Sequence, residues 1–225
     1  MYDNVLTPEQ LELLGFIRHF NKDYYLVGGT AMALQIGHRR SIDFDLFTLG
    51  PVRRLAIKKK VSEFDSNSTL LFEDTDQVHL IVAGVKLTFF SYPYEIDHPV
   101  RLYDVITMPN LLTLAAMKAY ALGRRAKWKD YVDLYILLQD RLTLEAICIE
   151  ADRLFGKAFS ARLFRGQLAY HEDIDYSEAV DFMPGYAEDS ASIRASLIEK
   201  SLENVIENEW PPAAIQTASW QNNVL

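Results

Sequence analysis

YYLVGGTA at residues 24–31, followed by SIDFDL at residues 41–46, is the part of the chain that decides its fold. The first stretch predicts a strand, a glycine turn and the start of a helix, and the second predicts a strand. Because side chains alternate across a strand, Asp43 and Asp45 point to one face, while Ile42, Phe44 and Leu46 point to the other, into a core. Two carboxylates on one face repel each other, and Mg²⁺, which prefers oxygen ligands, relieves that repulsion.

The adjacent glycines Gly28 and Gly29 suggest a phosphate site. Without Cβ atoms the backbone can approach a ligand closely, and the helix that follows offers free N–H groups to an anion. A metal site beside a phosphate cradle is what nucleotidyl transfer needs. The simpler alternatives are an ordinary tight turn for the glycines and an exposed strand face for the aspartates.

Length and composition set the class of protein. At 225 residues, with 49% hydrophobic residues, the chain can form one domain, alone or with a helical extension. No apolar run reaches the roughly 18 residues of a membrane span, and residues 1–4 do not resemble a signal peptide. The single cysteine, Cys148, can form no internal disulfide. We therefore expect a cytoplasmic protein.

The net charge of −8 is concentrated in one segment. Residues 171–209 contain eleven acidic and two basic side chains, and the rest of the chain is close to neutral. Binding of nucleic acid by overall charge is therefore not expected. Local basic clusters at residues 38–40, 53–54, 58–60 and 124–129 remain candidates for phosphate contacts, although solvated surfaces also explain them.

The order of elements predicts an α+β fold, with a small mixed β-sheet followed by a C-terminal helical part. We divide the chain into a core at residues 1–105, a helical part at 106–209 that completes a cleft, and a loose tail at 210–225. Thr7, Pro8 and Gln10 form a helix-start signal, and Gly37 and Gly123 mark helix ends. The expected strands are 24–27, 43–48, 69–73, 77–82 and 85–91, and the expected helices are 8–21, 30–36, 51–64, 109–122, 127–139, 143–155, 160–170 and 190–208.

Three motifs in order resemble a known family. They are VGGTA at residues 27–31, HRRSIDFDLF at 38–47, and Lys118, Ala121, Arg125, Lys129, Asp130, Asp133 and Leu134 on two successive helices. Together they resemble the nucleotidyltransferases of the AbiEii/AbiGii abortive-infection toxins, within the polymerase-β-like superfamily. The similarity covers about residues 26–138.

The resemblance implies a role for each matching position. Gly28, Gly29 and Thr30 would hold the triphosphate of an NTP, with Arg125 also on phosphate. Asp43 and Asp45 would be catalytic and bind Mg²⁺. Lys118 and Asp130 would complete the catalytic site from the helical half.

One position departs from the family pattern. The superfamily usually carries a third carboxylate on a later strand, and Thr88 stands at the corresponding position here. Three outcomes remain open: Asp130 or another group substitutes for the carboxylate, the metal site is weaker, or catalysis is feeble.

Several of these residues have simpler interpretations. Lys118 can be a surface lysine whose stem packs on apolar atoms, and Asp130 can interact with its helix dipole. Asp133 can pair with Lys129 or Arg125, and His38 is expected at the surface. The other histidines, His79 included, lack metal-ligand spacing, and the tyrosines and Trp128 are expected to pack rather than stack on bases.

Two functions of different class follow. The first is a Mg²⁺-dependent nucleotidyltransferase that moves NMP from an NTP to RNA (for example tRNA), protein or a small molecule, as the toxin of a toxin–antitoxin pair with a partner antitoxin. The alternative is a degenerate transferase fold that binds a nucleotide or a partner without turnover. Thr88 favours the second, and the intact pair of Asp43 and Asp45 favours the first.

Overall fold

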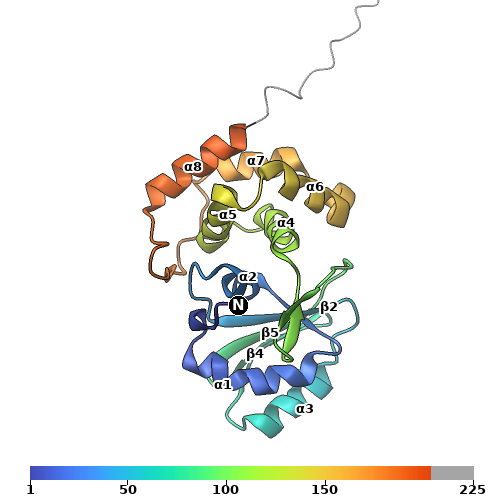
Figure 1. Ribbon diagram of the computed structural model, residues 1–225. Helices are drawn as coiled ribbons and strands as arrows, with labels where there is room; N and C mark the ends of the chain where they lie inside the picture. The colour runs from blue at the N-terminus through green and yellow to red at the C-terminus, as the bar shows by residue number, and fades with distance from the viewer. Residues whose placement is uncertain (204–225) are drawn as a thin grey trace, which may run out of the picture.

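The computed structural model describes residues 1–203, and it places a β-sheet half below a helical half in the view of Figure 1. This is the α+β arrangement that the sequence predicts. The buried apolar residues of both halves belong to one continuous core. No helix in the described part is long and apolar enough to cross a membrane.

The main sheet has five strands in the order β1-β2-β5-β4-β3. β2 and β5 pair in parallel, and the other neighbours are antiparallel. Four of the five strands have the predicted bounds, because apolar and polar residues alternate along them or turn residues delimit them. The strands are β1 (Tyr25–Val27), β2 (Asp43–Thr48), β3 (Thr69–Glu73), β4 (Gln77–Val82) and β5 (Val85–Ser91).

Three α-helices accompany this sheet. α1 (Pro8–Ile17) begins with the predicted capping box, in which the Thr7 side chain accepts from the Gln10 N–H and the Gln10 side chain accepts from the Thr7 N–H. In Figure 1, α1 and α3 (Arg54–Phe64) lie on one side of the sheet, and α2 (Gly28–Ile36) lies on the other, toward the helical half. Single 3₁₀ turns flank α1 at Asp3–Val5 and Arg18–Phe20.

One prediction about the core is wrong. Ile42 was expected to point inward with Phe44 and Leu46, which are fully buried. Ile42 is instead 65% exposed, because it precedes the first paired residue of β2, Asp43. The alternation of faces therefore begins one residue later than the sequence pattern suggests.

A short hairpin connects the two halves and was not predicted. It consists of β6 (Val100–Leu102) and β7 (Ile106–Met108). A division of the chain between residues 105 and 106 would pass through this hairpin. Strands of three residues leave too short an alternation for a sequence pattern to detect.

Up to residue 203, the helical half contains five α-helices, most of them started by a side chain that accepts a backbone N–H. Asn110, Thr143, Ser160 and Asp189 supply these caps. The helices are α4 (Leu111–Leu122), α5 (Trp128–Asp140), α6 (Leu144–Phe155), α7 (Ala161–Ala169) and α8 (Ser190–Leu202), with a 3₁₀ turn at Gly156–Ala158. The last helix was predicted to residue 208; residues 204–209 and the predicted loose tail lie outside the described residues.

The acidic segment between α7 and α8 returns to the sheet half. Met183 N–H donates to the His38 carbonyl at 2.9 Å, and Arg40 N–H donates to the Asp181 carbonyl at 2.8 Å. Glu178 pairs with both Lys127 and Lys129 at the start of α5. Part of the concentrated negative charge is thereby neutralised by neighbouring lysines.

Candidate active site

The two aspartates of β2 lie on one face of the sheet, opposite to the fully buried Phe44 and Leu46. Burial alternates along β2, with Phe44, Leu46 and Thr48 buried and Asp43, Asp45 and Phe47 only partly so. The geometric prediction that the carboxylates share one face is therefore confirmed.

Strand pairing sets what lies beside each aspartate. Asp43 pairs with Lys86 on β5. Asp45 pairs with Thr88, which in turn pairs with His79 on β4. Paired residues point to the same side of a sheet, so Thr88 lies beside Asp45 at the position that corresponds to the third carboxylate of the superfamily. Within residues 1–203 no group of three His, Cys, Asp or Glu side chains is placed to hold a metal ion.

The charge of the Asp45 carboxylate is only partly balanced by its surroundings. Burial raises the pKa of Asp45, and the neighbouring charge of Asp43 raises it further. Arg125, the Thr88 hydroxyl and Lys86 act in the opposite direction but do not cancel the rise. The ionised form of this carboxylate is thus incompletely compensated by the described residues.

Each glycine of the turn makes room for a different charged group. Gly28 has φ +72°, and a Cβ there would collide with the carboxylate of Asp45. A Cβ on Gly29 would lie 2.5 Å from Nη2 of Arg39 and 2.9 Å from Oγ of Ser41. The turn therefore lets Asp45 and Arg39 approach the N-terminus of α2 closely.

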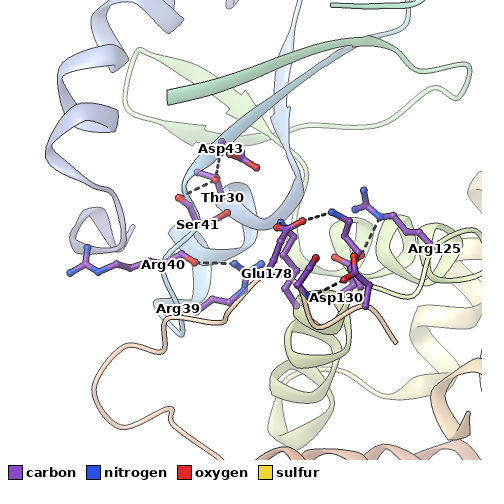
Figure 2. Close-up of polar contacts among 12 residues, drawn as sticks. Thr30, Arg39, Arg40, Ser41, Asp43, Arg125, Asp130 and Glu178 are labelled. Atoms are coloured by element: carbon purple, nitrogen blue, oxygen red, sulfur yellow. Dashed lines mark hydrogen bonds and ion pairs between the residues drawn. The ribbon is translucent and has the colours of Figure 1, made fainter. Parts of the chain in front are cut away.

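Thr30 is placed differently from the expectation. Its side chain is buried, and its hydroxyl lies against the carbonyl of Asp43 and 3.5 Å from that of Ser41, as Figure 2 shows. The hydroxyl is thus used within the fold, where it ties α2 to the start of β2. Any contact of Thr30 with a triphosphate would have to use its backbone N–H.

The helical half presents Lys118 of α4 to the site, held by two aspartates of α5. Its Nζ lies 2.6 Å from Oδ1 of Asp130 and 2.7 Å from Oδ2 of Asp133, and the residue is 7% exposed. Burial lowers the pKa of Lys118, but the two carboxylates outweigh burial, so its pKa is raised overall. Lys118 is not a surface lysine, and it stays charged.

Asp133 has partners that the sequence did not indicate. It accepts from Nε of Arg39 at 2.6 Å, from Nη2 of Arg39 at 2.8 Å, and lies 2.7 Å from Nε2 of His38. His38 was expected at the surface and is fully buried. The proposed pairing of Asp133 with Lys129 or Arg125 is wrong. The sequence signal was the spacing of Asp130 and Asp133, which puts both on the same face of a helix.

Asp130 is engaged on both oxygens. Oδ1 contacts Lys118, and Oδ2 lies 3.3 Å from Nε of Arg125, a contact that Figure 2 displays. Burial raises the pKa of Asp130, but Lys118 and Arg125 lower it more, so the pKa falls below its usual value. These contacts suit a residue that positions two cations better than one that accepts a proton.

A cavity of about 510 Å³ lies between the sheet and α4. Of the site residues that the sequence predicts, it is lined by Gly28, Asp45, Lys118 and Arg125. Gly29, Thr30, Asp43 and Asp130 are not among the residues that line it. The cavity is also lined by His79, Lys86, Thr88 and Arg124. A set of apolar side chains without a site motif in the sequence completes the lining: Phe47, Phe90, Tyr92, Pro93, Tyr94, Leu114, Met117 and Tyr120.

Comparison with known proteins agrees with this architecture. Residues 83–212 match the family model described as the nucleotidyl transferase AbiEii toxin of type IV toxin–antitoxin systems. An uncharacterized protein of Aquifex aeolicus (strain VF5) is 33% identical over 140 residues, which cover 60% of this chain and 68% of that protein.

Two solved structures share the fold at low sequence identity. The nucleotidyltransferase toxin MenT4 of Mycobacterium tuberculosis H37Rv superposes with a TM-score of 0.58 and 14% identity, over 86% of this chain and 82% of its own. JHP933 of Helicobacter pylori gives a TM-score of 0.51 and 15% identity, over 87% of this chain and 91% of its own.

Fold and site thus define a nucleotidyltransferase-like protein. The family model matches more than half of the chain, and this identifies the family: the chain belongs to the AbiEii family of nucleotidyltransferase toxins.

Proposed function

We propose that this protein transfers a nucleoside monophosphate from an NTP to an acceptor and releases pyrophosphate. One observation carries the proposal. A single cavity is bordered by Gly28 and Asp45 of the sheet half and by Lys118 and Arg125 of the helical half. In the reaction, an acceptor oxygen attacks the α-phosphorus, the bond to the bridging oxygen breaks, and the proton of an attacking hydroxyl leaves.

The two aspartates fit a Mg²⁺ ion. Mg²⁺ uses one or two carboxylates and completes its coordination with water and substrate phosphates. Asp43 and Asp45 offer that number on one face, and the nearby cations Arg39, Lys118 and Arg125 form their ion pairs elsewhere. When bound, the ion would neutralise charge on the phosphates and orient them.

The protein groups would act mainly on the triphosphate. Lys118 and Arg125 present positive charge to the cavity, and the N-terminus of α2 adds backbone N–H groups around Gly28, Gly29 and Thr30. Such fixed charges stabilise the negative charge that develops on the leaving pyrophosphate. Asp130 would serve the reaction through the cations it holds in place.

The family suggests a toxin whose activity a partner antitoxin controls. RNA (tRNA among the candidates), protein and small molecules are the acceptor classes that we consider. The test is to incubate the protein with each of four α-labelled NTPs, Mg²⁺ and a cell extract, then separate RNA, protein and small molecules. Label in RNA or protein, or a new labelled small molecule, supports transfer; wild-type protein that gives no more labelled product than Asp45→Asn in any of the three fractions would count against it.

Thr88 supports a second candidate, a fold that binds nucleotide without turnover. The two candidates separate in one comparison. Saturable NTP binding without label transfer to any acceptor favours the binding module, whereas transfer that depends on Asp43 and Asp45 favours the enzyme.

A further inference from the structure

The cavity lining has a charged part and an aromatic part. Asp45, Lys118 and Arg125 form the charged end: Lys118 and Arg125 share Asp130 as an ion-pair partner, and Arg125 acts electrostatically on Asp45. The other end is lined by five aromatic side chains, which we call the aromatic wall: Phe47, Phe90, Tyr92, Tyr94 and Tyr120. A ligand that fills the cavity would therefore need an anionic part and a planar apolar part.

The aromatic wall is continuous from the sheet to α4. Ring centroids are 5.1 Å apart for Phe47 with Phe90, 5.1 Å for Phe47 with Tyr92, 5.3 Å for Tyr92 with Tyr94, and 5.5 Å for Tyr94 with Tyr120. The hydroxyls of Tyr94 and Tyr120 are 2.8 Å apart, which joins the loop after β5 to α4. Contacts of this kind fix the rings before any ligand arrives.

Phe47 and Phe90 are the rings best placed to receive a flat ligand. Both are only partly buried and line the cavity. Tyr120 is less available: Phe155 stacks on its ring at 4.1 Å, and the Arg124 guanidinium lies 3.6 Å from its ring centroid. Because two groups so close cannot share one face, both faces of Tyr120 are covered.

Strand geometry fixes the distance between the aromatic rings and the charged end of the cavity. Phe47 follows Asp45 by two residues on β2, and Phe90 follows Thr88 by two residues on β5. At about 3.3 Å per residue, each aromatic ring stands roughly 7 Å along the strand from the charged end. That step leaves room for one ribose between a phosphate and a base.

We propose that Phe47 and Phe90 form a nucleobase-stacking subsite. This inference rests on the proposed function, because it supposes that the charged end holds a triphosphate. The base belongs either to the NTP or to the terminal nucleotide of an RNA acceptor. Stacking on aromatic rings tolerates every base, because each has a π-face.

The experiment compares binding of ligands with and without a base. Calorimetry in the presence of Mg²⁺ would use the α,β-methylene analogues of the four NTPs, inorganic triphosphate, and a short single-stranded oligoribonucleotide. The variants are Phe47→Leu and Phe90→Leu. The matched control is Phe64→Leu on α3, on the opposite side of the sheet. Thermal unfolding checks that each variant is folded.

We expect wild-type protein to bind an NTP analogue more tightly than inorganic triphosphate. Phe47→Leu and Phe90→Leu should weaken binding of the analogue on the order of tenfold and leave triphosphate binding unchanged. Both variants should therefore bind the analogue more weakly than Phe64→Leu does. Weakening confined to the oligonucleotide would also support the subsite, with the base coming from the acceptor.

One result would overturn the inference: unchanged affinity of both variants for every ligand that carries a base, the NTP analogues and the oligonucleotide alike. Failure of the wild type to bind triphosphate in any form would instead overturn the proposed function.

Discussion

The chain holds two pairs of aspartates near its cavity, Asp43 with Asp45 on β2 and Asp130 with Asp133 on α5, and they differ in how their charge is balanced. The pKa of Asp45 is raised by burial and by Asp43. For Asp130 and Asp133, burial raises the pKa, but paired cations lower it more. A carboxylate that is partly withdrawn from water without a paired cation costs stability, so its presence points to a ligand. A fully paired one is explained by the fold alone.

Asp45→Asn should cause the largest change, with loss of about 10³-fold or more in transfer rate, if this carboxylate helps to bind the metal that stabilises the transferring phosphate. Stability should stay the same or increase, because the substitution removes a partly buried, incompletely compensated charge. Rates of label transfer and urea unfolding measure the two effects. An unfolded variant, or one with normal activity, would show that Asp45 belongs with the structural pair.

Asp133→Asn should show the opposite pattern, with a large loss of stability. The substitution leaves Arg39 and Lys118 buried with one carboxylate fewer, and breaking a buried pair typically costs about 3–5 kcal/mol. Urea or thermal unfolding would detect it. The control is Asp181→Asn, which removes an exposed carboxylate 3.4 Å from Arg40 and should cost little. A stable Asp133→Asn protein would contradict the structural role.

The two pairs should also separate by pH. The pKa of Asp45 is raised on folding, so the stability that its protonated form contributes is full below the unfolded pKa of about 3.9 and is lost as pH rises through the folded pKa. The pKa of Asp133 is lowered, so its contribution is present above about 3.9 and is lost as pH falls through the folded pKa. We therefore expect that the decrease in unfolding free energy with rising pH that Asp45 causes is absent from Asp45→Asn. Measurement of the unfolding free energy from pH 3 to 7 tests this.

Asp130→Asn tests whether this residue positions cations or accepts a proton. If Asp130 substitutes for the third carboxylate by accepting the proton of the attacking hydroxyl, its removal typically costs about 10²–10⁴ in rate with little change in NTP binding. The contacts with Lys118 and Arg125 lead us to expect a loss of NTP affinity together with the loss of rate. Titration with an NTP analogue and a pH–rate profile decide. Unchanged affinity with a lost acidic limb would restore the proton-acceptor role.

The sequence predicts features that depend on residues close together in the chain, and it does not predict contacts between residues far apart in the chain. The bounds of β2 and the shared face of Asp43 and Asp45 depend on alternation between near neighbours, which a sequence pattern contains. The buried contacts of Asp133 join residues about 95 positions apart in the chain, and no local pattern reports them. The aromatic wall was missed for a related reason: the same rings would suit an ordinary core, and only the folded chain leaves Phe47 and Phe90 facing a cavity.

The smallest expected effects come from Thr88, whose neutral hydroxyl acts on Asp45 without balancing its charge as a paired cation would. Its hydroxyl lowers the pKa of Asp45, although less than burial raises it. Thr88→Val should remove this lowering of the Asp45 pKa. The acidic limb of the pH–rate profile should then move to higher pH, with a loss of rate of a few-fold. Thr88→Asp would add a third carboxylate beside Asp45, on the neighbouring strand.

A third oxygen ligand should lower the Mg²⁺ concentration needed for half-maximal activity, because affinity for a hard cation rises with the number of charged ligands. The same substitution should destabilise the metal-free protein, since three like charges then meet without a cation. Mg²⁺ titration of activity and of the thermal midpoint would report both changes. If Thr88→Asp altered neither, position 88 would not face the metal, and the absence of a third carboxylate would say nothing about catalysis in this chain.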